Sequence, residues 1–133
     1  MLINSATHLW GERPFDDAMS PSCMARNVPW LHWLLQGENW HNNHHAAPTS
    51  ASTWVGWYQL DGIYGLIRLL EVVGLATDVR VEVPMARAGE SVGSAGEFLQ
   101  FASGGLAFLT FLCWLGGRLG TGARGRALGK HDF

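Results

Sequence analysis

The sequence predicts a mainly α-helical chain that either contacts lipid or has lost the surface of a partner. Three observations indicate this class. Apolar residues make up 47% of the 133 residues and charged residues only 15%, against roughly 25% charged in ordinary soluble domains. From Gly62 onward, apolar residues recur at helical spacing. Residues 98–117 carry no charged side chain, and this run is close to the length of a membrane-spanning helix.

Charge and composition both change along the chain. The formal net charge is −2, so no general attraction to nucleic acid is expected. Residues 1–84 hold four arginines and eight acidic residues, whereas the rest holds five basic and three acidic residues. The chain also becomes rich in Gly, Ala and Ser after Pro84. We therefore expect one region over residues 1–84, a linker over 85–97, and an apolar segment with a basic tail over 98–133.

Two helices are expected before residue 75. Asn27 is suited to a helix N-cap and Pro29 to a first helical turn, so residues 30–36 are predicted to form a short apolar helix. A second helix begins near Gly62, and Gly74 is a natural residue to end it. On that helix one face carries Ile63, Leu66, Ile67, Leu70 and Val73.

Two further elements are expected in the second half of the chain. Residues 78–83 alternate polar and apolar side chains, which predicts a short strand that Pro84 ends. Residues 98–117 are a candidate single membrane helix, although four glycines weaken the pattern. The basic residues that follow would then lie on the cytoplasmic side. The alternative is an apolar tail that does not insert.

The most unusual stretch is GENWHNNHH, residues 37–45, which contains three of the six histidines. On a helix, His41, His44 and His45 share one face. Three imidazoles on one face are costly to bury without partners, and metal binding would satisfy them. Glu38 lies one turn earlier and could bind the metal or accept a ring N–H from a ligand. The alternative is a polar surface turn rich in histidine.

The other candidate residues give weaker signals. Asn4 and His8 have i, i+4 spacing and would share a helix face. His32 stands among tryptophans and leucines and is interpreted as a helix-packing residue. Cys23 and Cys113 fit no metal or redox spacing and are interpreted as buried free thiols.

Two linked motifs resemble the membrane fatty-acid desaturases, in particular their acyl-CoA (stearoyl-CoA) branch. GENWHNNHHAAP, residues 37–48, is similar to the third histidine box of that family, G-E-x-W/F-H-N-x-H-H-x-F-P. NSATHLWGERP, residues 4–14, is similar to the family's N-S-x-x-H-x-x-G motif followed by R-P. Residues 53–80 resemble its C-terminal cytosolic part, so the resemblance covers about residues 1–84.

The resemblance implies a fold and a metal site. The fold would be the C-terminal cytosolic cap of a membrane helical bundle, without most of the transmembrane domain. The bundle holds a di-iron centre, mainly through histidines. The residues implied are His8, His41, His44 and His45 as iron ligands, Asn4 as a ligand through water, and Glu38 and Asn42 as residues that support the ligands.

The resemblance also implies a reaction. Members of the family use O2 and two electrons to introduce a double bond, here of the delta-9 type, into a saturated acyl chain. The substrate would be an acyl-CoA or an acyl lipid. The electron donor would be cytochrome b5, or a protein of ferredoxin or rubredoxin type. The chain would lie at a membrane, with residues 1–84 on the cytoplasmic face.

The sequence departs from the family in two ways. The two earlier boxes, H-x-x-x-x-H and H-x-x-H-H, do not precede residue 4, and Ala47 stands where the family has phenylalanine. We therefore expect a C-terminal portion that is inactive by itself. The alternatives are a decayed or non-catalytic fragment and a related histidine-box membrane oxygenase, such as a hydroxylase.

Overall fold

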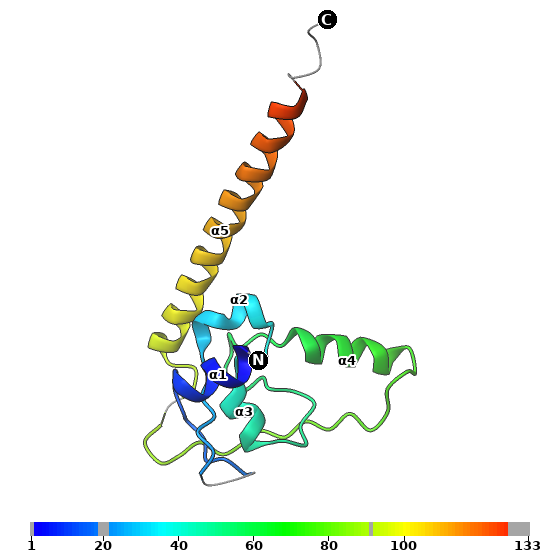
Figure 1. The fold of residues 1–133 in the computed structure, drawn as a ribbon. Coiled ribbons are helices and arrows are strands. Elements are labelled where there is room, and N and C mark those ends of the chain that lie inside the picture. Colours follow the sequence, from blue (N-terminus) through cyan, green and yellow to red (C-terminus); the bar gives the residue numbers. More distant parts are fainter. Residues whose placement is uncertain (1, 19–21, 91, 128–133) are drawn as a thin grey trace, which may run out of the picture.

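Short helices joined by long irregular segments form a small body, and one long helix extends from it (Figure 1). The computed structural model describes residues 2–18, 22–90 and 92–127. The helices are α1 (Leu2–Leu9), the 3-10 helix η1 (Pro29–Leu31), α2 (His32–Leu35), α3 (His41–Ala46), α4 (Gly62–Val72) and α5 (Ala95–Ala127). The described residues contain only isolated β-bridges and no strand. The prediction of a mainly α chain is therefore confirmed.

A small apolar cluster joins α1 to the segment that contains η1 and α2. Ala6, Val28 and Leu31 are buried together, and Leu35 packs against them. Backbone hydrogen bonds add to this contact, because the N–H of Arg26 donates to the carbonyl of Thr7 at 2.7 Å. This packing fixes the position of α1, which carries His8.

The predicted helix at residues 30–36 forms as η1 followed by α2, but Asn27 does not cap it. Its N-cap is Val28, which makes no side-chain capping bond. The side chain of Asn27 turns to α3 instead, where its Oδ1 accepts the N–H groups of Asn42 at 3.0 Å and Asn43 at 3.3 Å. Asn27 therefore satisfies the start of a helix distant in sequence, which spacing alone could not indicate.

A second, aromatic cluster attaches α5 to the body. Trp40, Tyr58 and Phe101 are buried together, with Trp33 and Phe98 packed against them. The indole N–H of Trp33 donates to the carbonyl of Phe101 at 2.9 Å. Gly105 allows this approach, because a Cβ there would lie 2.8 Å from the ring of Trp33. Two of the glycines that weaken the membrane-helix pattern, Gly104 and Gly105, thus allow close packing near the start of α5.

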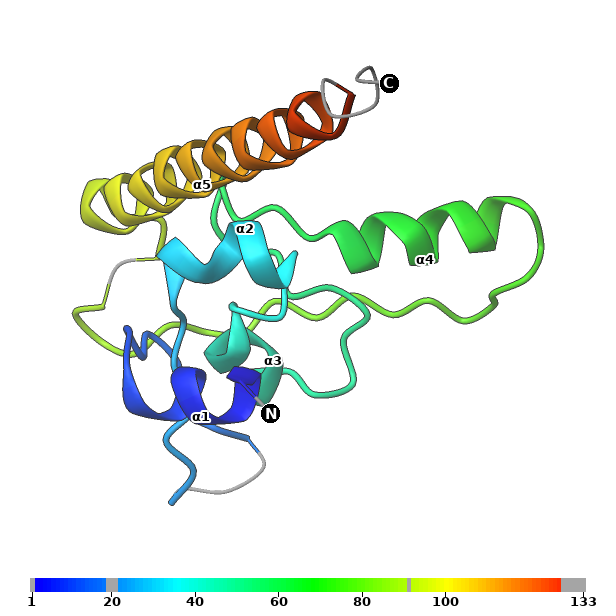
Figure 2. The same cartoon turned by 45° about the horizontal axis from the view of Figure 1, so that its top comes forward.

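Helix α4 confirms the prediction for residues 62–73. Asp61 is the N-cap, and its side chain accepts the N–H of Tyr64 at 2.8 Å. Gly74 follows the helix with a φ of +77°, a conformation that glycine adopts readily. No residue of α4 is buried, so its apolar face is not covered by the described part of the chain. Figures 1 and 2 show α4 extending away from the short helices.

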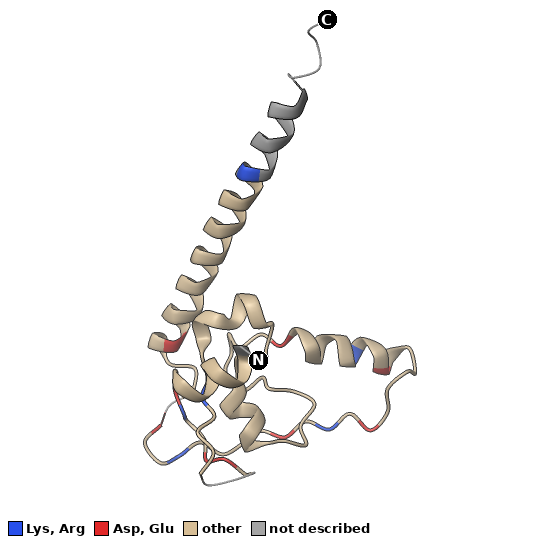
Figure 3. Ribbon diagram, in the orientation of Figure 1, with Lys and Arg blue, Asp and Glu red and all other residues tan. Residues whose placement is uncertain are grey.

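Helix α5 contains the predicted membrane segment. Residues Ala95–Gly116 have a mean hydropathy of 1.6 and are largely exposed, so by length and composition this stretch could cross a membrane. Figure 3 shows a long stretch of α5 without a charged residue. In the sequence, this stretch lies between Glu97 and Arg118. The predicted basic tail continues into residues 128–133, which lie outside the described residues.

The strand predicted at residues 78–83 is wrong. These residues are irregular, and the contacts that hold them go to a single loop. The N–H of Ala51 donates to the carbonyl of Arg80 at 2.8 Å, and the N–H of Glu82 donates to the hydroxyl of Ser50 at 3.1 Å. Alternating polar and apolar side chains favour a half-buried strand only where a second strand is available to form hydrogen bonds with the first.

Candidate metal centre

Buried amide side chains hold the short helix α3 in place. The amide of Asn42 pairs with the backbone of Phe15, accepting its N–H at 2.8 Å and donating to its carbonyl at 3.2 Å. Asn43 donates to the carbonyl of Thr53 and to the side chain of Gln59, both at 2.8 Å. A helix of six residues is unstable in isolation, so these bonds are what present its histidines in a fixed direction.

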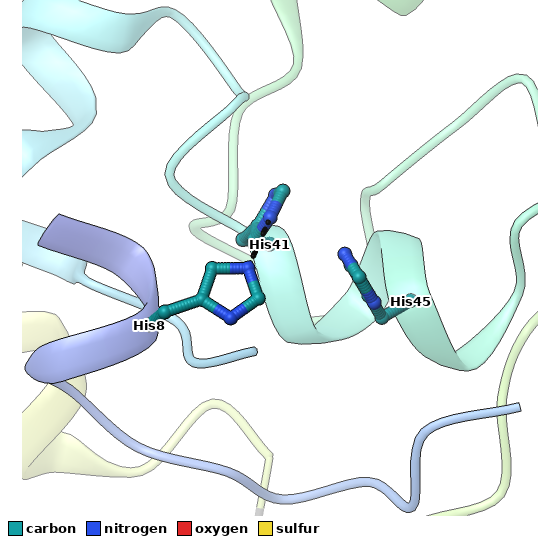
Figure 4. A group of neighbouring side chains, drawn as sticks. All are labelled: His8, His41 and His45. Carbon is teal, nitrogen blue, oxygen red and sulfur yellow. Dashed lines mark hydrogen bonds between the residues drawn. The ribbon is translucent and has the colours of Figure 1, made fainter. Parts of the chain in front are cut away.

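Three of the predicted histidines come together from two elements. Figure 4 shows the ring of His8, on α1, facing His41 and His45 on α3. The Nε2 atoms of His8 and His41 are 3.2 Å apart. Each of the three residues offers a ligand atom, and these atoms all lie within 4.8 Å of one another. This is the spacing that donors around one metal ion would have.

The protonation of His41 suits metal binding. Burial, followed by the charges of the neighbouring His45 and His8, lowers the pKa of His41 to about 4. The ring is therefore neutral at physiological pH and keeps a lone pair. Neutral imidazole is a good ligand for iron, zinc and copper.

A carboxylate and a thiol flank the histidine group. Asp17, whose side chain is fully buried, places Oδ2 at 2.9 Å from Nδ1 of His45. Cys23 places Sγ at 3.3 Å from the same nitrogen and 4.0 Å from Nδ1 of His8. Burial, with a hydrogen bond to Asp17, raises the pKa of the Cys23 thiol. A carboxylate on the second ring nitrogen is the usual way to orient a metal-binding histidine.

No pattern in the sequence indicates the positions that Asp17 and Cys23 take beside His45. Cys23 fits no local metal or redox spacing, because the residue that it contacts is His45, 22 positions along the chain. The interpretation of Cys23 as a thiol without a disulfide agrees with the structure, as it does for Cys113. Cys113 is exposed on α5, so the expectation that it is buried is wrong.

The structure does not place the other predicted residues, His44, Glu38 and Asn4, in this three-histidine group. His44 is exposed, with its ring centroid 6.1 Å from that of His41 and 5.7 Å from that of His45. His44 and the exposed Glu38 line a cavity of about 190 Å³ with Asp61. Asn4 is exposed on α1, one turn before His8.

His32 is part of the aromatic packing. It is buried, with its Nδ1 at 3.2 Å from the side chain of Asn39. Its ring packs against Trp33, Trp40 and Phe101.

The fold and these side chains together define a helical protein with a histidine-rich candidate metal centre. No family model matches the chain. Several curated proteins are nevertheless similar to it in sequence. It is 49% identical over 80 residues to the delta-9 desaturase-like 5 protein of Arabidopsis thaliana. It is 45% identical over 80 residues to the delta-9 acyl-lipid desaturase 1 of the same plant. To the acyl-CoA C20 delta5-desaturase of Anemone leveillei it is 42% identical over 80 residues.

The similarity covers about 60% of this chain and about 25% of each of these relatives, so the chain spans about a quarter of their length. Over that part, the chain is similar to proteins named as fatty-acid desaturases. This similarity supports the family that the sequence motifs led us to expect.

Proposed function

We propose that this chain supplies part of the iron-binding site of an O2-dependent fatty-acyl desaturase. The observation that supports this most directly is the convergence of His8 with His41 and His45 from two separate helices. The residues fit iron, because the donor set is imidazole, its buried member is neutral, and a carboxylate orients another. His44 would complete the ligand set from the same helix, after a change of side-chain rotamer.

The other residues would act around these ligands. Asn4 would reach the metal through water, and Glu38 would accept a ring N–H from a ligand. Asn42 would act through α3, because its amide fixes the helix on the backbone of Phe15. Iron would supply the strong oxidant that removing hydrogen from an unactivated methylene requires, which side chains cannot supply.

The proposal extends to substrate, electron donor and location. The relatives' names include delta-9 desaturases, an acyl-lipid desaturase and an acyl-CoA desaturase. We therefore propose a delta-9 type reaction on a fatty-acyl chain carried by CoA or by a lipid. Electrons would come from cytochrome b5 or from a ferredoxin- or rubredoxin-type protein. The apolar α5 supports a position at a membrane, with residues 1–84 on its cytoplasmic face.

Ferrous ion binding tests this proposal. The detergent-solubilised chain is dialysed without oxygen against ferrous ion, and bound iron is measured as a function of concentration. Replacing one ligand, as in His8→Ala or His41→Ala, should weaken binding by about tenfold or more. His131→Ala is the matched control, because His131 is far in sequence from the cluster. Equal affinity in the wild type and His8→Ala would contradict the proposal.

We also propose that this chain alone forms no unsaturated product, because two iron ions need more ligands than the four histidines of its two motifs supply. The assay combines the purified chain with iron, a reductant and an acyl-CoA, and measures product by mass spectrometry. The control is the double variant His41→Ala, His44→Ala. Turnover by the wild type above this control would show that the chain is sufficient.

A further inference from the structure

We propose that Asp17, Cys23 and His45 form a second metal site, for an ion of the zinc class, next to the three-histidine group. Neither the family resemblance nor the relatives' names point to a thiolate ligand or to Asp17. The site therefore goes beyond the proposed desaturase function.

The geometry supports one ion between these three side chains. One ligand atom from each of them lies within 4.8 Å of the others. Nδ1 of His45 is 2.9 Å from Oδ2 of Asp17 and 3.3 Å from Sγ of Cys23. With zinc bonds of about 2.0–2.3 Å in a tetrahedron, neighbouring N and O ligands lie about 3.3 Å apart and N and S ligands about 3.6 Å apart. The side chains need to separate by only a few tenths of an ångström to admit the ion.

The chemistry of the donors is also that of zinc. Thiolate, imidazole and carboxylate are the three ligand types that zinc uses, and thiolate selects against magnesium and calcium. The carboxylate of Asp17 is fully buried, and a buried charge requires compensation. The His45 ring and the Cys23 thiol face this carboxylate. A divalent cation bound here would compensate the charge of the carboxylate more fully than these two groups do. A solvent molecule could be the fourth ligand.

Metal binding here involves a defined proton change. The Cys23 thiol releases its proton to solvent, and a sulfur–metal bond forms. The neutral ring of His45 binds through Nδ1, so its one remaining proton lies on Nε2. His45 then has no lone pair for a second metal, and a zinc-class ion would remove it from the three-histidine group. This last consequence rests on the proposed function, whereas the site itself does not.

Cobalt(II) substitution tests the site, because a cobalt–thiolate bond gives a charge-transfer absorption in the near ultraviolet that nitrogen and oxygen ligands do not. The reduced, detergent-solubilised chain is titrated with cobalt(II). We expect the band in the wild type and its loss in Cys23→Ser. Cys113→Ser is the matched control and should keep the band, because Cys113 is exposed on α5.

Two further variants test the other ligands. Asp17→Asn should weaken cobalt affinity by about tenfold or more, whereas the control Asp16→Asn, at the neighbouring exposed residue, should leave it unchanged. Far-ultraviolet circular dichroism checks that each variant keeps its helix content. A wild type without the band, or a band that persists in Cys23→Ser, would overturn the proposal.

His8→Ala separates this site from the desaturase proposal. Its thiolate band should persist at wild-type affinity, because His8 is not among the three ligands. Loss of the band in His8→Ala would show that Cys23 only completes the three-histidine group, and would overturn a separate site. If the desaturase proposal alone fails, ferrous binding becomes insensitive to His8 while the thiolate band remains.

Discussion

At the scale of single residues, Asn27 has the most consequential side chain outside the histidines. It is fully buried, and its Oδ1 accepts two N–H groups at the start of α3. Its Nδ2 donates to the side chain of Asn43 at 2.7 Å. The orientation of His41 and His45 therefore depends on a residue that binds no metal.

Replacing Asn27 with alanine should destabilise the protein and disorder α3. Lost capping and newly unsatisfied buried groups each cost about 1–2 kcal/mol, so we expect the free energy of unfolding to fall by about 2–4 kcal/mol. Denaturant unfolding measures this change. Asn4→Ala is the matched control, since Asn4 is exposed, and it should change stability by less than about 0.5 kcal/mol. A similar small change for Asn27→Ala would show that the amide network does not hold α3.

At the scale of elements, two carboxyl groups lie where α5 meets the body, the buried Glu97 and the half-buried Glu12. Oε2 of Glu97, in the first turn of α5, accepts the hydroxyl of Tyr58 at 2.7 Å and the N–H of Gly93 at 2.7 Å. Burial, with the hydrogen bond and charge of Glu97, raises the pKa of Glu12 to about 7. A protonated Glu12 can therefore donate to Glu97 and attach α5 to the loop after α1.

This contact predicts a stability that falls as pH rises. The pKa of Glu12 is about 7 in the folded protein against 4.5 for an ordinary glutamate. Its contribution is therefore complete below about pH 4.5 and is lost as pH rises through about 7. The pKa of His41 is about 4, so that ring stays neutral and does not contribute above pH 6.5.

Denaturant unfolding between pH 6.5 and 8.5 tests this dependence. The wild type should lose stability over this range, and Glu12→Gln, which cannot ionise, should lose less. Glu38→Gln, at an exposed glutamate, should behave like the wild type. Equal pH dependence in Glu12→Gln and the wild type would show that another group is responsible.

At the scale of the whole molecule, features that depend on local sequence patterns could be predicted, whereas features that depend on contacts between distant segments could not. Helix α4 and its end at Gly74 follow from periodicity and glycine chemistry, both of which are local. The shared face of His41 and His45 follows from helix spacing in the same way. By contrast, the prediction of a strand at residues 78–83 was wrong, because a strand needs a second segment with which to form backbone hydrogen bonds.

The residues that the sequence did not identify all act through distant contacts. Asn27 acts on α3 rather than on the helix that follows it. Asp17 and Cys23 meet His45 only after the loop that follows α1 has folded against α3. The approach of His8 to α3 was expected from the family resemblance, because an i, i+4 pair on α1 does not by itself indicate which helix it faces.

We propose above all that His8, His41 and His45 bind one iron ion together. X-ray absorption spectroscopy of the iron-loaded chain tests this most directly, because multiple scattering from imidazole rings reports the number of histidine ligands. We predict at least three histidines on iron in the wild type and one fewer in His8→Ala. An unchanged histidine count in His8→Ala would contradict the claim, because α1 would then contribute nothing to the metal site.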